Sequence, residues 1–274
     1  MASVLAVGVL LAGCGSGDDS AGGSGGRTGG DFHSLVADPA NPDRIYVGGH
    51  QAVSVSNDGG ATWEDVAALR DADAMGWAFT DEHMYVSGHP GLNRSGDGGN
   101  TFDRENGGLP TTDVHALGGS GATLYGAGPG GGFFAGNPDS GWEQRNAEVG
   151  HSFFGRILVD AADPDRIFAA DPQAGVASSV DGGRTWQLLN APITSALWLS
   201  TPDPDLGTIV ASGPAGAAIS HDGGATWQSI QTPEGVTLVE AAPGQPGLLY
   251  AGQHQGEHVA IWASTDAGDT WTKR

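Results

Sequence analysis

Residues 220–227 read Ser-His-Asp-Gly-Gly-Ala-Thr-Trp, and this stretch decides the fold because it recurs along the chain. Its pattern is S-x-D-x-G-x-T followed by an aromatic residue, and four further copies begin at Ser56, Ser95, Ser179 and Ser264. A sixth, degenerate copy ends at Trp142. The aromatic residues that end the copies are Trp63, Phe102, Trp142, Trp186, Trp227 and Trp271, at intervals of 39, 40, 44, 41 and 44 residues. An interval of about 40 residues is typical of the four-stranded blade of a β-propeller.

The residues that precede each copy repeat as well. Residues 33–50 (HSLVADPANPDRIYVGGH) and 156–171 (RILVDAADPDRIFAAD) both contain an apolar strand, a turn rich in Pro and Asp, and a second apolar strand. A third alternating segment then leads into the repeated motif. We therefore predict an all-β fold: a six-bladed β-propeller of four-stranded antiparallel blades, built from residues 31–274.

The repeated motif itself is predicted to be a structural turn between the third and fourth strands of each blade. Ser and Asp side chains bond to the backbone of turns, and glycine adopts the positive φ that tight turns need. The aromatic residue that follows is expected to pack between neighbouring sheets. An active site occurs once in a molecule, whereas this motif occurs in every predicted blade, so it marks the fold rather than catalysis.

These copies resemble the Asp-box, or bacterial neuraminidase (BNR), repeat superfamily, which includes sialidases, sortilin-type ectodomains and photosystem II assembly propellers. They also resemble bacterial lipoproteins that are labelled as glycosyl hydrolases of this repeat class. The resemblance implies an exo-sialidase-like glycoside hydrolase as the alternative to a non-catalytic binding or scaffold module. Sialidase chemistry needs a tyrosine nucleophile, but Tyr46, Tyr85, Tyr125 and Tyr250 share one strand position and are predicted to be core residues.

We therefore favour a protein that is not an enzyme and assign no catalytic residue. A glycosidase that uses two carboxylates stays open as a form of the alternative. The acidic residues expected on the face that lies opposite the repeated turns are Asp73, Asp113, Glu148 and Asp171.

The first thirty residues predict a lipid anchor and a tether. Cys14 is the only cysteine and ends the sequence Leu-Ala-Gly-Cys after an apolar run, which resembles the bacterial lipobox. We interpret residues 1–14 as a lipoprotein signal peptide with its lipobox, although no Lys or Arg precedes the apolar run, and residues 15–30 as a flexible Gly/Ser linker. The propeller is then expected at the extracytoplasmic face of the cell membrane, held in the bilayer by acylated Cys14.

Charge excludes one class of partner. The chain has 32 acidic and 11 basic residues, a formal net charge of -21, and no basic stripe. Nucleic-acid binding is therefore not expected, and the self-repelling surface favours a monomer.

Histidines are the residues that suggest a binding site. The predicted topology places six of them on one face of the propeller, on the loops and strand ends near its axis. They are His33, His50, His89, His115, His151 and His254. Met75, with Asp71 and Asp73, is expected at the same rim. Neutral imidazole is the commonest transition-metal ligand and a thioether suits copper, so the cluster predicts a copper or zinc site.

Three alternatives to a metal stay open at this stage. The histidines are also consistent with separate polar rim residues, with a site for a small anion or glycan, and with a platform for a protein partner.

Overall fold

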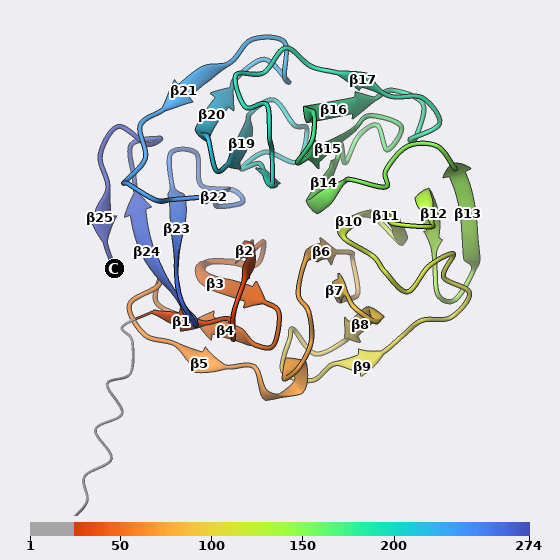
Figure 1. The fold of residues 1–274 in the computed structure, drawn as a ribbon, viewed down its shortest axis with the longest axis horizontal. Helices are drawn as coiled ribbons and strands as arrows, with labels where there is room; N and C mark the ends of the chain where they lie inside the picture. Colours follow the sequence, from red (N-terminus) through yellow and green to blue (C-terminus); the bar gives the residue numbers. More distant parts are fainter. Residues whose placement is uncertain (1–24) are drawn as a thin grey trace, which may run out of the picture.

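The computed structural model describes residues 25–274, and its strands form consecutive antiparallel meanders arranged in a ring (Figure 1). The predicted lipobox and Cys14 lie outside the described residues. The described part is all-β apart from one short 3₁₀ helix, η1 (Ala67–Leu69). It contains no helix of the length and apolarity needed to cross a membrane.

Each meander runs from the centre of the ring to its rim, so the first strand is innermost and the fourth is outermost (Figure 1). The first meander consists of β2 (Phe32–Asp38), β3 (Asn41–Gly49), β4 (Val53–Ser56) and β5 (Glu64–Asp65). The next two are β6 (Gly76–Phe79), β7 (Met84–Gly88), β8 (Gly91–Ser95) and β9 (Asp103–Arg104), then β10 (Ala116–Ser120), β11 (Thr123–Gly128), β12 (Gly132–Asn137) and β13 (Gly141–Asn146).

The second half of the chain repeats this order. Its meanders are β14 (Phe154–Val159), β15 (Ile167–Asp171), β16 (Gly175–Ser179) and β17 (Gln187–Leu188); β18 (Trp198–Ser200), β19 (Ile209–Gly213), β20 (Gly216–Ser220) and β21 (Gln228–Ile230); and β22 (Leu238–Ala241), β23 (Leu249–Gln255), β24 (His258–Ser264) and β25 (Thr272–Lys273). A short parallel pairing between β10 and β14 joins two meanders into one eight-stranded sheet.

The ring is closed by both ends of the described chain. Strand β1 (Gly26–Arg27) pairs with β24, through Gly26 to Val259 and Arg27 to His258, while β25 pairs with the other half of β24. At the last residue, the Nε of Arg274 donates to the carbonyl of Gly59 over 3.0 Å. Residues 15–30 are predicted to be a linker, but residues 26–27 pair with β24 in the last sheet.

The repeated turns hold themselves together by local hydrogen bonds. In residues 220–227, the Ser220 hydroxyl donates to Asp222 (2.8 Å) and accepts from the backbone N–H of Gly224 (2.8 Å). Asp222 also accepts from the backbone N–H and the hydroxyl of Thr226, at 2.7 and 2.6 Å. The other four full copies make the same bonds. This confirms the predicted structural role of the motif.

Apolar side chains fill the space between the sheets. The largest fully buried side chains include Trp77, Trp198 and Phe133. The four tyrosines are buried in the core, as predicted, and therefore are not available as surface nucleophiles. The strand ends and loops near the axis are left to form sites at the two mouths of the ring.

Candidate metal site

The candidate site lies where the first three meanders meet at the centre of the ring, on the face opposite the Asp-box turns. Three of its histidines come from the start of β2 (His33) and from the residues after β3 (His50) and β7 (His89). The segment before β10 supplies Asp113 and His115. Each residue lies at a strand end because the strands of a meander alternate in direction and return to this face.

Asp73 organises three of these histidines. Its carboxylate lies 2.8 Å from His33 Nδ1, 3.0 Å from His89 Nδ1 and 3.5 Å from His50 Nδ1. Only 5% of Asp73 is exposed. Burial alone would raise the pKa of Asp73, but the hydrogen bonds and charge of the neighbouring histidines outweigh burial and lower this pKa. Asp73 is therefore held as a carboxylate that accepts hydrogen bonds from imidazole N–H groups.

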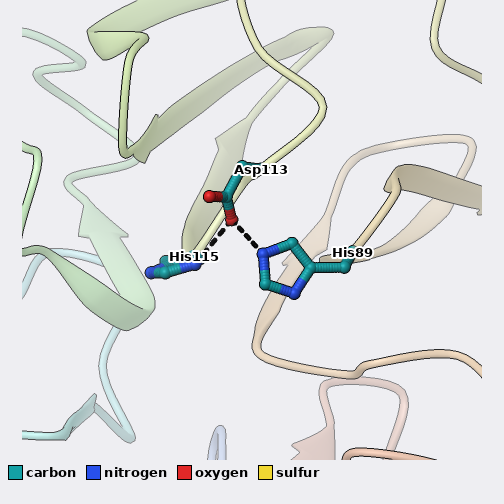
Figure 2. Close-up of side chains that lie close together, drawn as sticks. All are labelled: His89, Asp113 and His115. Carbon is teal, nitrogen blue, oxygen red and sulfur yellow. Dashed lines mark ion pairs between the residues drawn. The ribbon is translucent and has the colours of Figure 1, made fainter.

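A second carboxylate, Asp113, collects two imidazoles at a single oxygen. Its Oδ1 lies 2.6 Å from His115 Nε2 and also contacts His89 Nε2, and Figure 2 shows both rings approaching that oxygen. The three donor atoms lie within 4.8 Å of one another. Within residues 25–274 this is the one group of three or more His, Cys, Asp or Glu residues that is close enough to hold a metal ion.

The contact between Asp113 and His115 is short but poorly directed. Although the two atoms approach to 2.6 Å, both are buried and neither has a partner with acceptable hydrogen-bond geometry among the described residues. A buried polar atom without a partner costs about 1–3 kcal/mol. A cation between the two imidazole nitrogens and the carboxylate oxygen would satisfy these atoms together.

His89 connects the two carboxylates. Its Nδ1 faces Asp73 and its Nε2 faces Asp113. When the Nδ1–H of a histidine donates a hydrogen bond to a carboxylate, the lone pair is fixed on Nε2, which is the usual arrangement behind a metal-ligating histidine. The tautomer that suits metal binding is therefore the one that Asp73 selects.

One aromatic residue covers the inner side of this cluster. The ring of Phe154, in β14, meets His33 edge-on with a centroid separation of 5.6 Å, and it lies 6.1 Å from the ring of His115. An apolar neighbour lowers the local polarity on that side. Nothing in the sequence distinguished Phe154 from a core phenylalanine.

Two of the six predicted histidines lie apart from this cluster. The exposed His151 bonds through Nε2 to the carbonyl of Ala147 (2.9 Å), and His254 contacts the carbonyl of Gly30. Met75 is buried, with 6% of its surface exposed. The structure thus brings four of the six histidines together.

From the sequence, Asp113 is predicted as one of the carboxylates on this face but not as a metal ligand. The signal that was available is local: Asp113 and His115 are separated by one residue just before an inner strand. Side chains two apart on an extended segment point the same way, so the pair presents two donors together.

Comparison with known proteins identifies the repeat. Residues 218–229 match the BNR/Asp-box repeat model. No curated protein sequence matches the chain.

Solved structures of similar architecture include a GH74 enzyme of Niastella koreensis (TM-score 0.61, 15% identity, 91% of this chain and 46% of that one). Another is YCF48 of Cyanidioschyzon merolae (TM-score 0.54, 16% identity, 90% of this chain and 85% of that one). YCF48 bound to a D1 peptide is also similar (TM-score 0.52, 16% identity, 90% of this chain and 81% of that one). The chain spans less than half the length of the GH74 enzyme, and identities this low concern the fold alone. The repeated turns, the ring of meanders and these similarities together show that the chain is a β-propeller of the BNR/Asp-box repeat type.

Proposed function

We propose that this protein is a binding module that holds a divalent transition metal through His89, Asp113 and His115. The observation that carries the proposal is the convergence of His89, Asp113 and His115, whose donor atoms lie within 4.8 Å of one another. The poorly directed contact between Asp113 and His115, and the support of His89 by Asp73, add to it. In this proposal each of the six four-stranded meanders is one blade, and the metal lies at the mouth of the central channel.

The donor set narrows the choice of metal. Two imidazoles and one carboxylate suit borderline divalent ions such as Zn²⁺ and Cu²⁺, whereas Cu⁺ prefers thiolate and thioether donors. The convergent group of His89, Asp113 and His115 supplies imidazole and carboxylate donors and no thiolate. We therefore propose zinc or Cu²⁺ rather than Cu⁺. Three protein donors leave a coordination position for water or for a bound partner.

The arrangement of the carboxylates favours metal binding over glycoside hydrolysis. A glycosidase needs open space between its two carboxylates for the sugar and, in inverting enzymes, a water molecule. Here the imidazole of His89 lies between Asp73 and Asp113 and contacts both. For this pair of carboxylates, a side chain therefore fills the space in which a glycosidic bond would have to lie.

Metal content and affinity of the purified chain test the proposal. Elemental analysis and zinc and copper titrations would compare the unchanged chain with His89→Ala and His115→Ala. The matched control is His151→Ala, which removes an exposed histidine bonded only to a backbone carbonyl. We expect about one ion per chain, with affinity reduced at least about tenfold in the two site variants and unchanged in the control. Equal affinity in all four proteins, with unchanged circular dichroism, would refute the site.

We also propose that acylated Cys14 holds the propeller at the extracytoplasmic face of the membrane. The support is the lipobox-like sequence, which lies outside the described residues, followed by a Gly/Ser-rich stretch that leads to β1. Replacement of Cys14 by Ser should move the protein from the membrane fraction to the soluble fraction of its host. If the variant stays with the membrane, Cys14 is not the anchor.

A further inference from the structure

A cavity of about 390 Å³ opens at the other mouth of the channel, on the face that carries the Asp-box turns. Its walls come from the ends of β6, β10 and β14 and from the turns that follow β2, β18 and β22. The turns between first and second strands all reach this face, so every meander contributes to the wall. A cavity of this size falls within the range of small-molecule sites.

One cation lies at the inner end of this cavity. Arg156, in β14, lines the cavity with 14% of its side chain exposed, and its Nη1 donates to Glu240 Oε1 over 3.1 Å. Glu240 is completely buried and also accepts from the indole N–H of Trp198 (2.8 Å) and the backbone N–H of Ala37 (3.1 Å). The bonds from Trp198 and Ala37 hold Glu240 in place, and Glu240 in turn positions the guanidinium of Arg156.

The guanidinium keeps donors that the described protein does not use. Within residues 25–274 its single hydrogen bond is the one from Nη1 to Glu240. Arginine carries five N–H donors in a planar fork that matches a carboxylate. The Nε and Nη2 groups of Arg156 therefore remain for a ligand inside the cavity.

The burial of Glu240 weakens its charge pairing with Arg156. Burial raises the pKa of Glu240 to about 7, and the charge of Arg156 opposes that rise. The partners of Glu240 from the other strands packed on it, Trp198 and Ala37, are neutral donors. Burial therefore disfavours the carboxylate form of Glu240 that pairs with Arg156.

The remaining walls are mostly apolar, with a few hydroxyl side chains, and two acidic residues also line the cavity. The ring of Phe79 lies 6.0 Å from the Cζ of Arg156, and Pro39 and Val159 add further apolar surface. Asp81 and Asp203 line the cavity as well. Their negative charges disfavour phosphates and other polyanions, which leaves ligands with a single negative charge.

We propose that this cavity is a second ligand site, which binds a small monocarboxylic acid with an apolar body. The carboxylate accepts hydrogen bonds from Arg156 Nε and Nη2, and the apolar body lies against Phe79. This site is separate from the proposed metal site, because the buried network of Arg156, Glu240 and Trp198 lies beyond the inner end of the cavity. Since it opens on the opposite face, ligand and metal are able to bind at the same time.

Binding of phenylacetate to the metal-free purified chain tests the proposal, with the neutral phenylacetamide as a comparison. A panel of further aryl and alkyl monocarboxylates extends the search. The readout is the NMR shift of the Arg156 Nε–H and the Trp77 indole N–H, because both residues line the cavity. We expect saturable shifts with the acids and at least about tenfold weaker binding of the amide.

Two variants, each tested separately, should abolish this binding in different ways. Ala161→Trp fills the mouth of the cavity from an exposed position, and Arg156→Met/Glu240→Gln removes the cation together with its buried partner. Ala225→Trp, on an exposed Asp-box turn outside the cavity, is the matched control and should bind normally.

Three results would overturn the proposal. The first is binding that survives Ala161→Trp, and the second is equal affinity for acid and amide. The third is the absence of a saturable shift across the whole panel. None of these results bears on the metal site, because the experiment uses metal-free protein.

Discussion

At the scale of single residues, Asp73 decides how the histidines of the candidate metal site are organised. It contacts His33, His50 and His89, of which His89 is a proposed ligand. Because Asp73 touches the opposite nitrogen of His89, it acts as a positioning residue and does not belong to the convergent donor group. Without the negative charge of Asp73, the tautomer of His89 would no longer be fixed, although all three proposed ligands would remain in the chain.

Replacement of Asp73 by Asn should therefore weaken metal binding without removing it. We expect affinity to fall by about 10- to 100-fold, the usual effect of losing a partner behind a metal ligand. Titration calorimetry measures the affinity, and NMR of the His89 ring nitrogens reports the tautomer, which a purely structural role would not change.

Asp71→Asn is the matched control for this measurement. Asp71 is exposed in the same segment at a φ of 62°, a region that Asn tolerates well. If the two variants bind metal equally well, Asp73 has no positioning role.

At the scale of the element, the Asp-box turn is a self-contained unit. The bonds from Ser220 and Thr226 to Asp222 span two and four residues. Hydrogen bonds from the Thr226 hydroxyl and backbone, followed by that of Ser220, lower the pKa of Asp222 to about 2. The carboxylate form is thus the form that folds the turn, and each full copy shows the same shift.

This shift predicts the direction of acid unfolding. Because the folded-state pKa of Asp222 lies below the ordinary value of 3.8, its contribution to stability is complete above pH 3.8. That contribution is lost as the pH falls towards about 2. Asp222→Asn should lower the melting temperature at neutral pH and make it less dependent on pH in the acid range. Thermal melts by circular dichroism across that range measure the effect.

The control for the turn is Asp269→Asn, in the last Asp-box turn. Asp269 is exposed, and it donates a hydrogen bond from its backbone N–H to the carbonyl of Asp266, without involving its carboxylate. Its replacement should leave the acid profile unchanged. An identical profile for both variants would show that the carboxylate bonds of the turn do not stabilise the fold.

At the scale of the whole molecule, closure of the ring depends on residues before the first full meander. Strand β1 adds to the edge of β24, and the hydroxyl of Ser54 accepts from the backbone N–H of Arg27 (2.8 Å) and donates to its carbonyl (2.9 Å). The same short segment therefore contacts the last and the first meander. A ring opens most easily at the junction between its two ends, and β1 lies at that junction.

Truncation experiments test this closure. A chain that begins at residue 31 lacks β1 and should melt at a lower temperature than the full chain, because β24 loses part of its partner. A chain that begins at residue 25 keeps β1 and should melt like the full chain. If both truncated proteins have the same melting temperature as the full chain, β1 does not contribute to closure.

The sequence by itself determined the repeat, the turn chemistry and the all-β propeller architecture, because these depend on interactions within a few residues. Ser220, Asp222 and Thr226 bond to one another wherever the chain places them, so the pattern is readable in one dimension. The same alternation of strands predicted which histidines reach one face. It did not distinguish His89 and His115 from His151 and His254, since all six were assigned to that face.

Only the tertiary structure decided which side chains meet. His33 and Asp73 are 40 residues apart, and Arg156 and Glu240 are 84 apart. Their contacts depend on how the first strands of different meanders converge on the axis and on the side-chain directions there. The pairing of β1 with β24 likewise joins the two ends of the described chain. Contacts of this kind are set by the closure of the ring, which no local pattern of residues encodes.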